Sequence, residues 1–130
     1  MTDTHTTIQD ASQWVLDFSK ERDWEQFHNP KDLTVALVCE VGEILEHFRY
    51  RSNEAIAEAL NEPEGRRAVA HEIADCFWLV LRLAEVCKVD LAAALHEKLQ
   101  LAALKYPVGQ SYGRADKYTA YQPRAADETS

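Results

Sequence analysis

The sequence predicts an all-α fold, a bundle of four to five helices. Glycine and proline, the residues that interrupt helices, are scarce, with four of each among 130 residues. Apolar residues recur three or four positions apart along most of the chain, which is typical of amphipathic helices. No stretch of the sequence has the alternation of apolar and polar residues that indicates a strand.

The first part of the chain is expected to form two helices. Residues 1–6 are polar, and we expect them to be disordered. An apolar stripe predicts a helix over residues 8–22. The next helix is expected over residues 30–50, because Asn29 is a suitable N-cap and Pro30 is a favourable first helical residue.

The remaining helices follow from proline positions and apolar content. A short helix is expected between turns in residues 51–65. Pro63 opens a long helix whose centre is apolar on nearly all sides, so we place this helix in the middle of the bundle. A last helix over residues 91–105 is expected to be capped by Asp90 and to stop before Pro107.

Length and composition limit the class of protein. The 130 residues fit one domain, expected over residues 7–119 and followed by a disordered tail over residues 120–130. The formal net charge of −8 argues against a DNA or RNA partner, because a basic footprint is missing. No signal region or membrane-spanning run is present, so we expect a cytoplasmic protein without membrane association. Cys39, Cys76 and Cys87 form no CxxC pair and predict buried thiols rather than a disulfide or zinc site.

Two pairs of carboxylates stand at helical spacing in apolar segments. Glu40 and Glu43 are three apart in CEVGEILEHF, and Glu72 and Asp75 are three apart in HEIADCF. Residues three apart lie about 60° from each other around a helix, so each pair shares a face. Two such helices facing each other would gather four carboxylates, whose repulsion is relieved by protonation or by a bound cation. Oxygen ligands favour Mg²⁺ or Mn²⁺, and Mg²⁺ often shares its shell with substrate phosphates.

Other interpretations of the carboxylates stay open. Ion pairs with Arg66, Arg67 or Arg82 would also explain acidic side chains among apolar ones. A di-iron bundle would require Glu-x-x-His on two helices, a motif that the sequence lacks. His47 and His71 are near the acids in sequence, but oxygen-only ligation does not need them.

The carboxylates stand among further motifs that together resemble the all-α nucleoside triphosphate pyrophosphohydrolases of the MazG superfamily, most closely the dCTP pyrophosphatase branch. The similarity covers residues 14–119, and its motifs in this order are far more specific than the acids alone. They are ERDWEQFHNPKDL at residues 21–33, the two acidic pairs, VDL at residues 89–91, Lys98, KYP at residues 105–107 and KYT at residues 117–119.

The resemblance implies hydrolysis of a nucleoside triphosphate to the monophosphate and pyrophosphate with Mg²⁺, for which Mn²⁺ could substitute. It implies dCTP or modified dCTP as substrate, a role in cleansing the nucleotide pool, and a homotetramer, a dimer of dimers, whose sites are lined by more than one chain. The implied metal ligands are Glu40, Glu43, Glu72 and Asp75. Glu43 is also the candidate base for the attacking water.

The resemblance also indicates where the substrate would bind. Aromatic faces in WEQFH would stack on the base, although without the resemblance Trp24 and Phe27 would be interpreted as core. Lysines near the C-terminus would contact phosphates. The candidate substrate-binding residues are Trp24, Glu25, Gln26, Phe27, His28, Tyr50, Lys98, Lys105 and Lys117.

Three positions depart from the family pattern, and two alternative functions remain. Val15, Leu79 and Ala102 stand where relatives can have histidine, tyrosine and asparagine, respectively. One alternative is a related all-α phosphohydrolase acting on another nucleotide, such as dUTP or a histidine-pathway intermediate, against which WEQFH argues. The other is a non-catalytic interaction bundle that binds Mg²⁺ for stability only.

Overall fold

The computed structural model describes residues 1–121, and all regular secondary structure in this range is helical. The prediction of an all-α fold is confirmed. The chain divides into two compact units, Met1–Asp90 and a second one that starts at Leu91. The elements are α1 (Ile8–Glu21), η1 (Glu25–Phe27), α2 (Pro30–Phe48), α3 (Asn53–Asn61), α4 (Pro63–Val86), α5 (Leu91–Lys105), α6 (Val108–Ser111) and η2 (Tyr118–Tyr121).

Polar caps define where the helices of the first unit begin. Thr7 and Asp10 form a capping box at the start of α1, in which each side chain accepts a hydrogen bond from the other's backbone N–H. The Asn29 side chain accepts from the Asp32 N–H at 2.9 Å, directly before Pro30, as predicted for α2. Ser52 caps α3 in the same way. Side chains thus satisfy free N–H groups at the start of α1, α2 and α3, whereas α4 starts at Pro63 without a side-chain cap.

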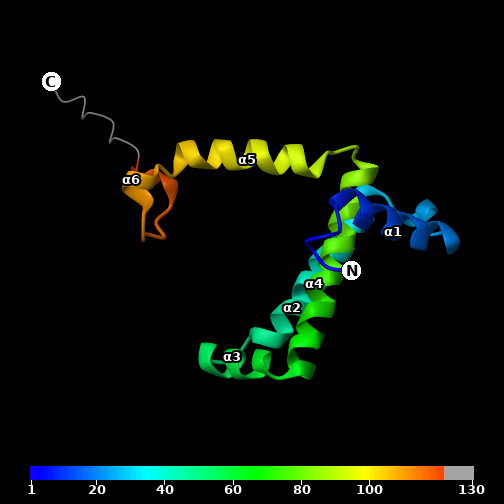
Figure 1. The fold of residues 1–130 in the computed structure, drawn as a ribbon, viewed down its shortest axis with the longest axis horizontal. Coiled ribbons are helices and arrows are strands. Elements are labelled where there is room, and N and C mark those ends of the chain that lie inside the picture. The colour runs from blue at the N-terminus through cyan, green and yellow to red at the C-terminus, as the bar shows by residue number, and fades with distance from the viewer. Residues whose placement is uncertain (122–130) are drawn as a thin grey trace. The chain divides into compact units, whose positions relative to one another are not determined.

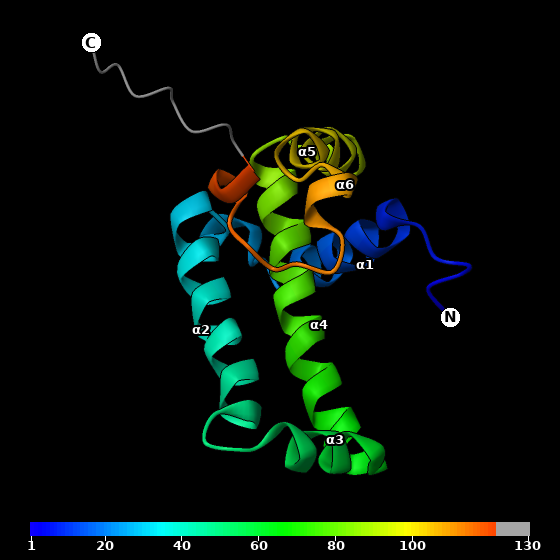
Figure 2. The ribbon, with the colours of Figure 1, turned by 90° about the vertical axis from the view of Figure 1, so that its left-hand side faces the viewer.

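Helix α4 is the centre of the first unit, as its apolar sequence predicted. It packs against α1, α2 and α3. Figures 1 and 2 show it running side by side with α2, with α3 at one end of the pair and α1 toward the other. Gly65 permits the close approach of α3, since a Cβ there would collide with the Ala59 carbonyl oxygen. The buried apolar side chains are Leu33, Val69, Leu79, Leu81 and Ala84.

The cysteines differ in part from the prediction. All three are free thiols, as expected for a chain without a disulfide framework. However, Cys39 and Cys87 are exposed, and only Cys76 is partly covered. Cys39 follows exposed Val38 on α2, and Cys87 is the C-cap residue of α4. The prediction of buried thiols was therefore wrong for Cys39 and Cys87. Both residues lie in apolar segments, but no other part of the described chain covers them.

The second unit is built from α5, α6 and η2. Tyr106, just after α5, makes edge-to-face contacts with Tyr118 and Tyr121 of η2, with ring centroids 6.4 and 6.1 Å away. The Lys105 ammonium lies 5.0 Å from the centroid of the Tyr118 ring. Aromatic contacts thus hold η2 near the end of α5, and the predicted disordered tail lies outside the described residues from position 122 onward.

The N-terminal segment before α1 contains a local hydrogen-bonded turn. Residues 1–6 contain a turn in which the N–H groups of His5 and Thr6 donate to the Thr2 carbonyl oxygen. Disorder of this segment and the single domain over residues 7–119 stay predictions. Among the described helices, none combines the length and the apolar content that crossing a membrane requires.

Candidate active site

Three of the four predicted metal ligands lie together between α2 and α4. Glu40 comes from α2, and Glu72 and Asp75 come from successive turns of α4. One carboxylate oxygen from each of the three lies within 4.8 Å of the other two, and all three residues are partly buried. Glu43 is exposed and lies outside this group. We call Glu40, Glu72 and Asp75 the carboxylate cluster. It results directly from the packing of α2 against α4.

In the part of the chain that the structure describes, no arginine forms an ion pair with the carboxylate cluster. Within residues 1–121, Arg82 pairs with Glu85, and Arg66 donates to the Leu60 carbonyl oxygen. His47 contacts the cluster, with its Nε2 3.9 Å from Glu72 Oε1. The structure of the described residues thus gives no support to an explanation of these acids by ion pairs with arginine.

Electrostatics in the carboxylate cluster favour a hard cation. Burial raises the pKa of Glu40, and the charges of Asp75, Glu72 and Glu43 raise it further. Burial and the charges of Glu40, Asp75 and Glu72 also raise the pKa of the Cys76 thiol. The donors of the carboxylate cluster are oxygen atoms, and this donor set fits Mg²⁺ or Mn²⁺.

A pocket of about 260 Å³ opens beside the carboxylate cluster. Glu40 belongs both to the cluster and to the wall of this pocket. We call it the base pocket because Trp24, Phe27 and His28, for which the sequence predicts contact with a base, line it. Its other walls come from the turn around η1, the first half of α2 and the middle of α4. Its lining residues are Trp24, Phe27, His28, Asp32, Leu33, Ala36, Glu40, Trp78 and Leu79.

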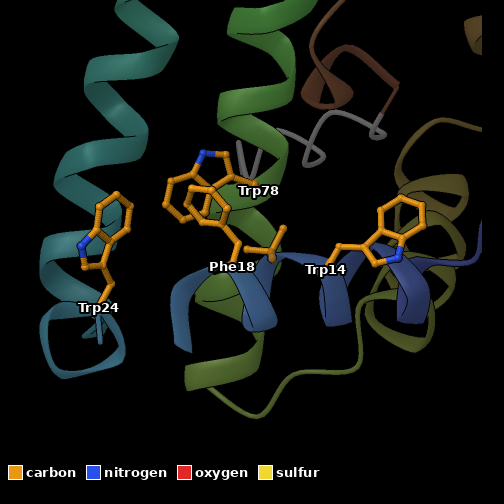
Figure 3. A pocket seen from close by; sticks show the side chains of 5 residues that line it. Trp14, Phe18, Trp24 and Trp78 are labelled. Carbon is orange, nitrogen blue, oxygen red and sulfur yellow. The ribbon is translucent and has the colours of Figure 1, made fainter. Parts of the chain in front are cut away.

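A second pocket of about 400 Å³ shares two walls with the base pocket. Its lining residues are Trp14, Val15, Phe18, Trp24 and Trp78, and we call it the aromatic pocket. Figure 3 shows Trp14 and Phe18 on α1, Trp78 on α4 and Trp24 before η1. The rings of Phe18 and Trp24 meet edge to face at 5.7 Å. The aromatic pocket is almost entirely apolar, so the two pockets offer different chemistry on either side of Trp24 and Trp78.

His28 is held in the base pocket by a long-range hydrogen bond. Arg82 Nε donates to His28 Nδ1 at 3.1 Å, and Arg82 Nη1 donates to Glu85 Oε2 at 2.6 Å. Burial lowers the pKa of His28, the Arg82 charge lowers it further, and Glu25 opposes the shift. His28 is therefore a neutral ring at physiological pH.

The chain is similar to known proteins over most of its length. It is 38% identical over 122 residues to bovine dCTP pyrophosphatase 1, covering 94% of this chain and 72% of the bovine protein. The chain belongs to the dCTP pyrophosphatase family. The human protein is 34% identical with the same coverage, and the rat protein is 40% identical over 113 residues, or 87% of this chain and 66% of the rat protein. A scan against protein-family models matched none.

The fold agrees with this family assignment. A pyrophosphatase from Archaeoglobus fulgidus DSM 4304 superposes with a TM-score of 0.71 at 30% sequence identity. The superposition covers 82% of this chain and 98% of the archaeal chain. The resemblance to all-α nucleoside triphosphate pyrophosphohydrolases is confirmed.

Only three of the five residues of the family motif WEQFH line the base pocket. Trp24, Phe27 and His28 line the pocket, but Glu25 and Gln26 do not. The Gln26 side-chain amide donates to the Asp23 backbone oxygen at 3.0 Å and to its carboxylate at 2.8 Å. Gln26 thus closes the turn before η1.

The other predicted substrate contacts lie away from the base pocket or in the second unit. Tyr50 follows α2 at the end opposite to His28, and a helix of 19 residues is about 28 Å long. Its side chain is 95% exposed, so within one chain it does not line this pocket. Lys98 and Lys105 are on α5, and Lys117 directly precedes η2. Their contacts with phosphate stay predictions.

Sequence reasoning missed Trp78 as a wall of both pockets. Its apolar neighbours suggested only a core position. The available signal was its spacing, because Trp78 follows Asp75 by three residues and therefore shares a helix face with it. Val15 and Leu79, two departures from the family pattern, also lie in pocket walls.

Proposed function

We propose that the protein hydrolyses a deoxynucleoside triphosphate, dCTP or a modified dCTP, to the monophosphate and pyrophosphate with Mg²⁺. The proposal rests on one observation: Glu40 belongs to the carboxylate cluster and also lines the base pocket. A ligand that fills this pocket and reaches the cluster needs a flat ring at one end and a cation-binding group at the other. The names of the curated relatives support the choice of dCTP.

The carboxylate cluster would hold the cation. Glu40, Glu72 and Asp75 supply oxygen donors from two helices, and Glu43 is the proposed fourth ligand. Mg²⁺ held by these residues would supply charge neutralisation for the phosphoryl oxygens of the substrate. Mn²⁺ prefers the same donors and is the expected substitute.

Hydrolysis also requires a base that takes a proton from water. The oxygen of water bonds to phosphorus, the bond between the α- and β-phosphoryl groups breaks, and pyrophosphate leaves. Glu43 is the proposed base, because it follows Glu40 by one helical turn and is exposed rather than committed to the carboxylate cluster.

The two pockets suggest how the base is chosen. Trp24, Phe27 and Trp78 provide aromatic faces for a stacked pyrimidine in the base pocket. The aromatic pocket continues from Trp24 and Trp78, where it would take an apolar substituent on the base. Val15 and Leu79 place aliphatic groups in these walls instead of the polar residues of some relatives. This apolar lining supports modified dCTP as a substrate.

We further propose the homotetramer that the resemblance implies. Val35, Val38, Val41 and Leu45 are each more than half exposed and recur at three- and four-residue spacing along α2. Contiguous apolar stripes of this kind mark contacts between chains. In such an assembly the exposed Tyr50 of one chain would be able to reach the base pocket of another.

A substrate panel with pyrophosphate detection tests the proposed function. Purified protein is given dCTP, 5-methyl-dCTP, dUTP and the other deoxynucleoside triphosphates, with Mg²⁺, with Mn²⁺ or with EDTA. We expect pyrophosphate from the cytosine nucleotides with either metal and none with EDTA. Turnover restricted to dUTP would favour the first alternative, and metal binding without any pyrophosphate release would favour the non-catalytic bundle.

A further inference from the structure

Arg82 and His28 form a contact that the proposed reaction does not use. They are 54 positions apart in sequence, yet Arg82 Nε donates to His28 Nδ1 at 3.1 Å. Arg82 is only 3% exposed, and its charge is compensated by Glu85 at 2.6 Å. A buried guanidinium with this partner is held in one position rather than moving in solvent.

The direction of this hydrogen bond determines where the His28 ring carries its proton. An arginine side chain has only donors, so the facing Nδ1 must be an acceptor without a proton. A neutral imidazole with an acceptor at Nδ1 carries its proton on Nε2. A cationic ring would lose the bond to Arg82 and would face a like charge. The charged groups around the ring are Arg82, Glu25 and, in the same pocket, Asp32 and Glu40.

The Nε2–H group is available to a ligand. His28 lines the base pocket, and within residues 1–121 its Nε2 makes no hydrogen bond to protein. Most of the remaining lining is aromatic or aliphatic. A single oriented donor in such surroundings selects strongly for a ligand atom that accepts a hydrogen bond.

We propose that Arg82, held by Glu85, is a positioning residue that fixes His28 as an Nε2–H donor to the N3 acceptor of the cytosine base. This inference rests on the proposed function and adds the basis of base selection. N3 of cytosine is a hydrogen-bond acceptor, whereas N3 of uracil carries a proton, and O2 accepts in both bases. A donor fixed opposite N3 therefore favours cytosine over uracil.

The first test observes the ring without turnover. Nitrogen-15 spectra of the His28 ring, assigned by comparison with His28→Gln, should show an unprotonated Nδ1 and a protonated Nε2. Adding dCMP should shift the Nε2 resonance. In Arg82→Met, the two nitrogens should average between tautomers, and Arg82→Lys, which keeps a donor, should restore the wild-type pattern.

The second test measures steady-state kinetics in the same variants. Arg82→Met should raise the KM for dCTP about five- to tenfold, the effect of one misaligned hydrogen bond, with kcat little changed. The ratio of kcat/KM for dCTP over dUTP should fall by a similar factor. Arg82→Lys should recover most of both effects. Glu85→Gln should give a smaller effect in the same direction, because Arg82 loses its anchor but keeps its donor.

The outcomes separate this inference from the proposed function. If the wild type turns over no triphosphate but dCMP still shifts Nε2 in an Arg82-dependent manner, the proposed function is lost and the positioning role stands. A proton on Nδ1 in the wild type overturns the inference, as does an unchanged dCTP to dUTP ratio in folded Arg82→Met. If Arg82→Met does not fold, unchanged spectra and ratios in Glu85→Gln overturn it equally.

Discussion

A carboxylate oxygen of Glu40 lies within 4.8 Å of one of Asp75, although the two residues belong to different helices. Their repulsion is part of what raises the pKa of Glu40. Such an approach is unfavourable in the free protein and becomes favourable when a cation lies between the oxygens. From the packing of α2 against α4 we therefore expect stability and metal binding to depend on each other.

Mg²⁺ should stabilise the fold. A ligand that binds only the folded state at a hundred times its Kd adds about 2.7 kcal/mol to the free energy of unfolding. In a chain of this size we expect the unfolding temperature to rise by several degrees, measured by thermal melts in EDTA and in Mg²⁺. Glu72→Gln should abolish the shift, whereas Glu58→Gln, at an exposed position of α3, should preserve it. An equal shift in both variants would place the cation elsewhere.

Glu40→Gln should stabilise the metal-free protein. The substitution removes one charge that is partly buried beside Asp75 and Glu72 while keeping the size of the side chain. We expect the unfolding temperature in EDTA to rise by a few degrees and the response to Mg²⁺ to disappear. A fall in that temperature would mean that the Glu40 carboxylate is stabilised by a favourable partner, contrary to the description above.

Two tryptophans should have separable effects on substrate binding. Trp78 lines both pockets, whereas Trp14 lines only the aromatic pocket. Stacking on a base contributes about 1–3 kcal/mol, so Trp78→Leu should raise the KM for dCTP roughly tenfold or more. Trp14→Leu should leave the KM for dCTP nearly unchanged and raise that for 5-substituted dCTP. Equal effects of Trp14→Leu on both nucleotides would show that the aromatic pocket does not receive the substituent.

His28 should make stability depend on pH. Its pKa in the folded state is below the ordinary value of 6.5, because burial and Arg82 disfavour the cation. The folded state thus binds fewer protons than the unfolded state in this range, and stability is present above pH 6.5 and lost as pH falls below it. In His28→Gln, which keeps an acceptor for Arg82 but does not titrate, the loss should be smaller. Parallel pH profiles of denaturant unfolding for the two proteins would contradict this.

The assembly should depend on the apolar stripe of α2. Replacing Val38 and Leu45 together by lysine places charges on an exposed apolar row and should convert the proposed tetramer to smaller species in sedimentation velocity. Lys31→Glu, at an exposed position near the start of the same helix, is the matched control. A wild-type monomer at micromolar concentration would refute the proposed tetramer.

The sequence predicted the helices well because their ends are encoded locally. Asn29 and Pro30 define the start of α2, and Pro63 defines the start of α4, through hydrogen bonds and backbone constraints within a few residues. The short elements η1, α6 and η2 were not predicted. Each spans a single turn, too short for an apolar period to be recognised.

The carboxylate cluster was predicted where one helix face determines it. Glu72 and Asp75 share a face of α4, and the apolar faces imply that Glu40 meets them when the helices pack. Trp78 and the Arg82–His28 bond were not anticipated, because they depend on how the turn around η1 meets α4. Contacts between residues 54 positions apart follow from tertiary packing, which periodicity does not specify.

Release of pyrophosphate from dCTP tests the central claim most directly. The measurement compares the wild type, Asp75→Asn and the control Glu58→Gln at saturating Mg²⁺, with folding verified by circular dichroism. We expect the wild type and Glu58→Gln each to release one pyrophosphate for each dCMP formed. In Asp75→Asn, kcat/KM should fall at least about a hundredfold, because a proposed metal ligand is removed. Turnover by Asp75→Asn at the wild-type rate would contradict the account.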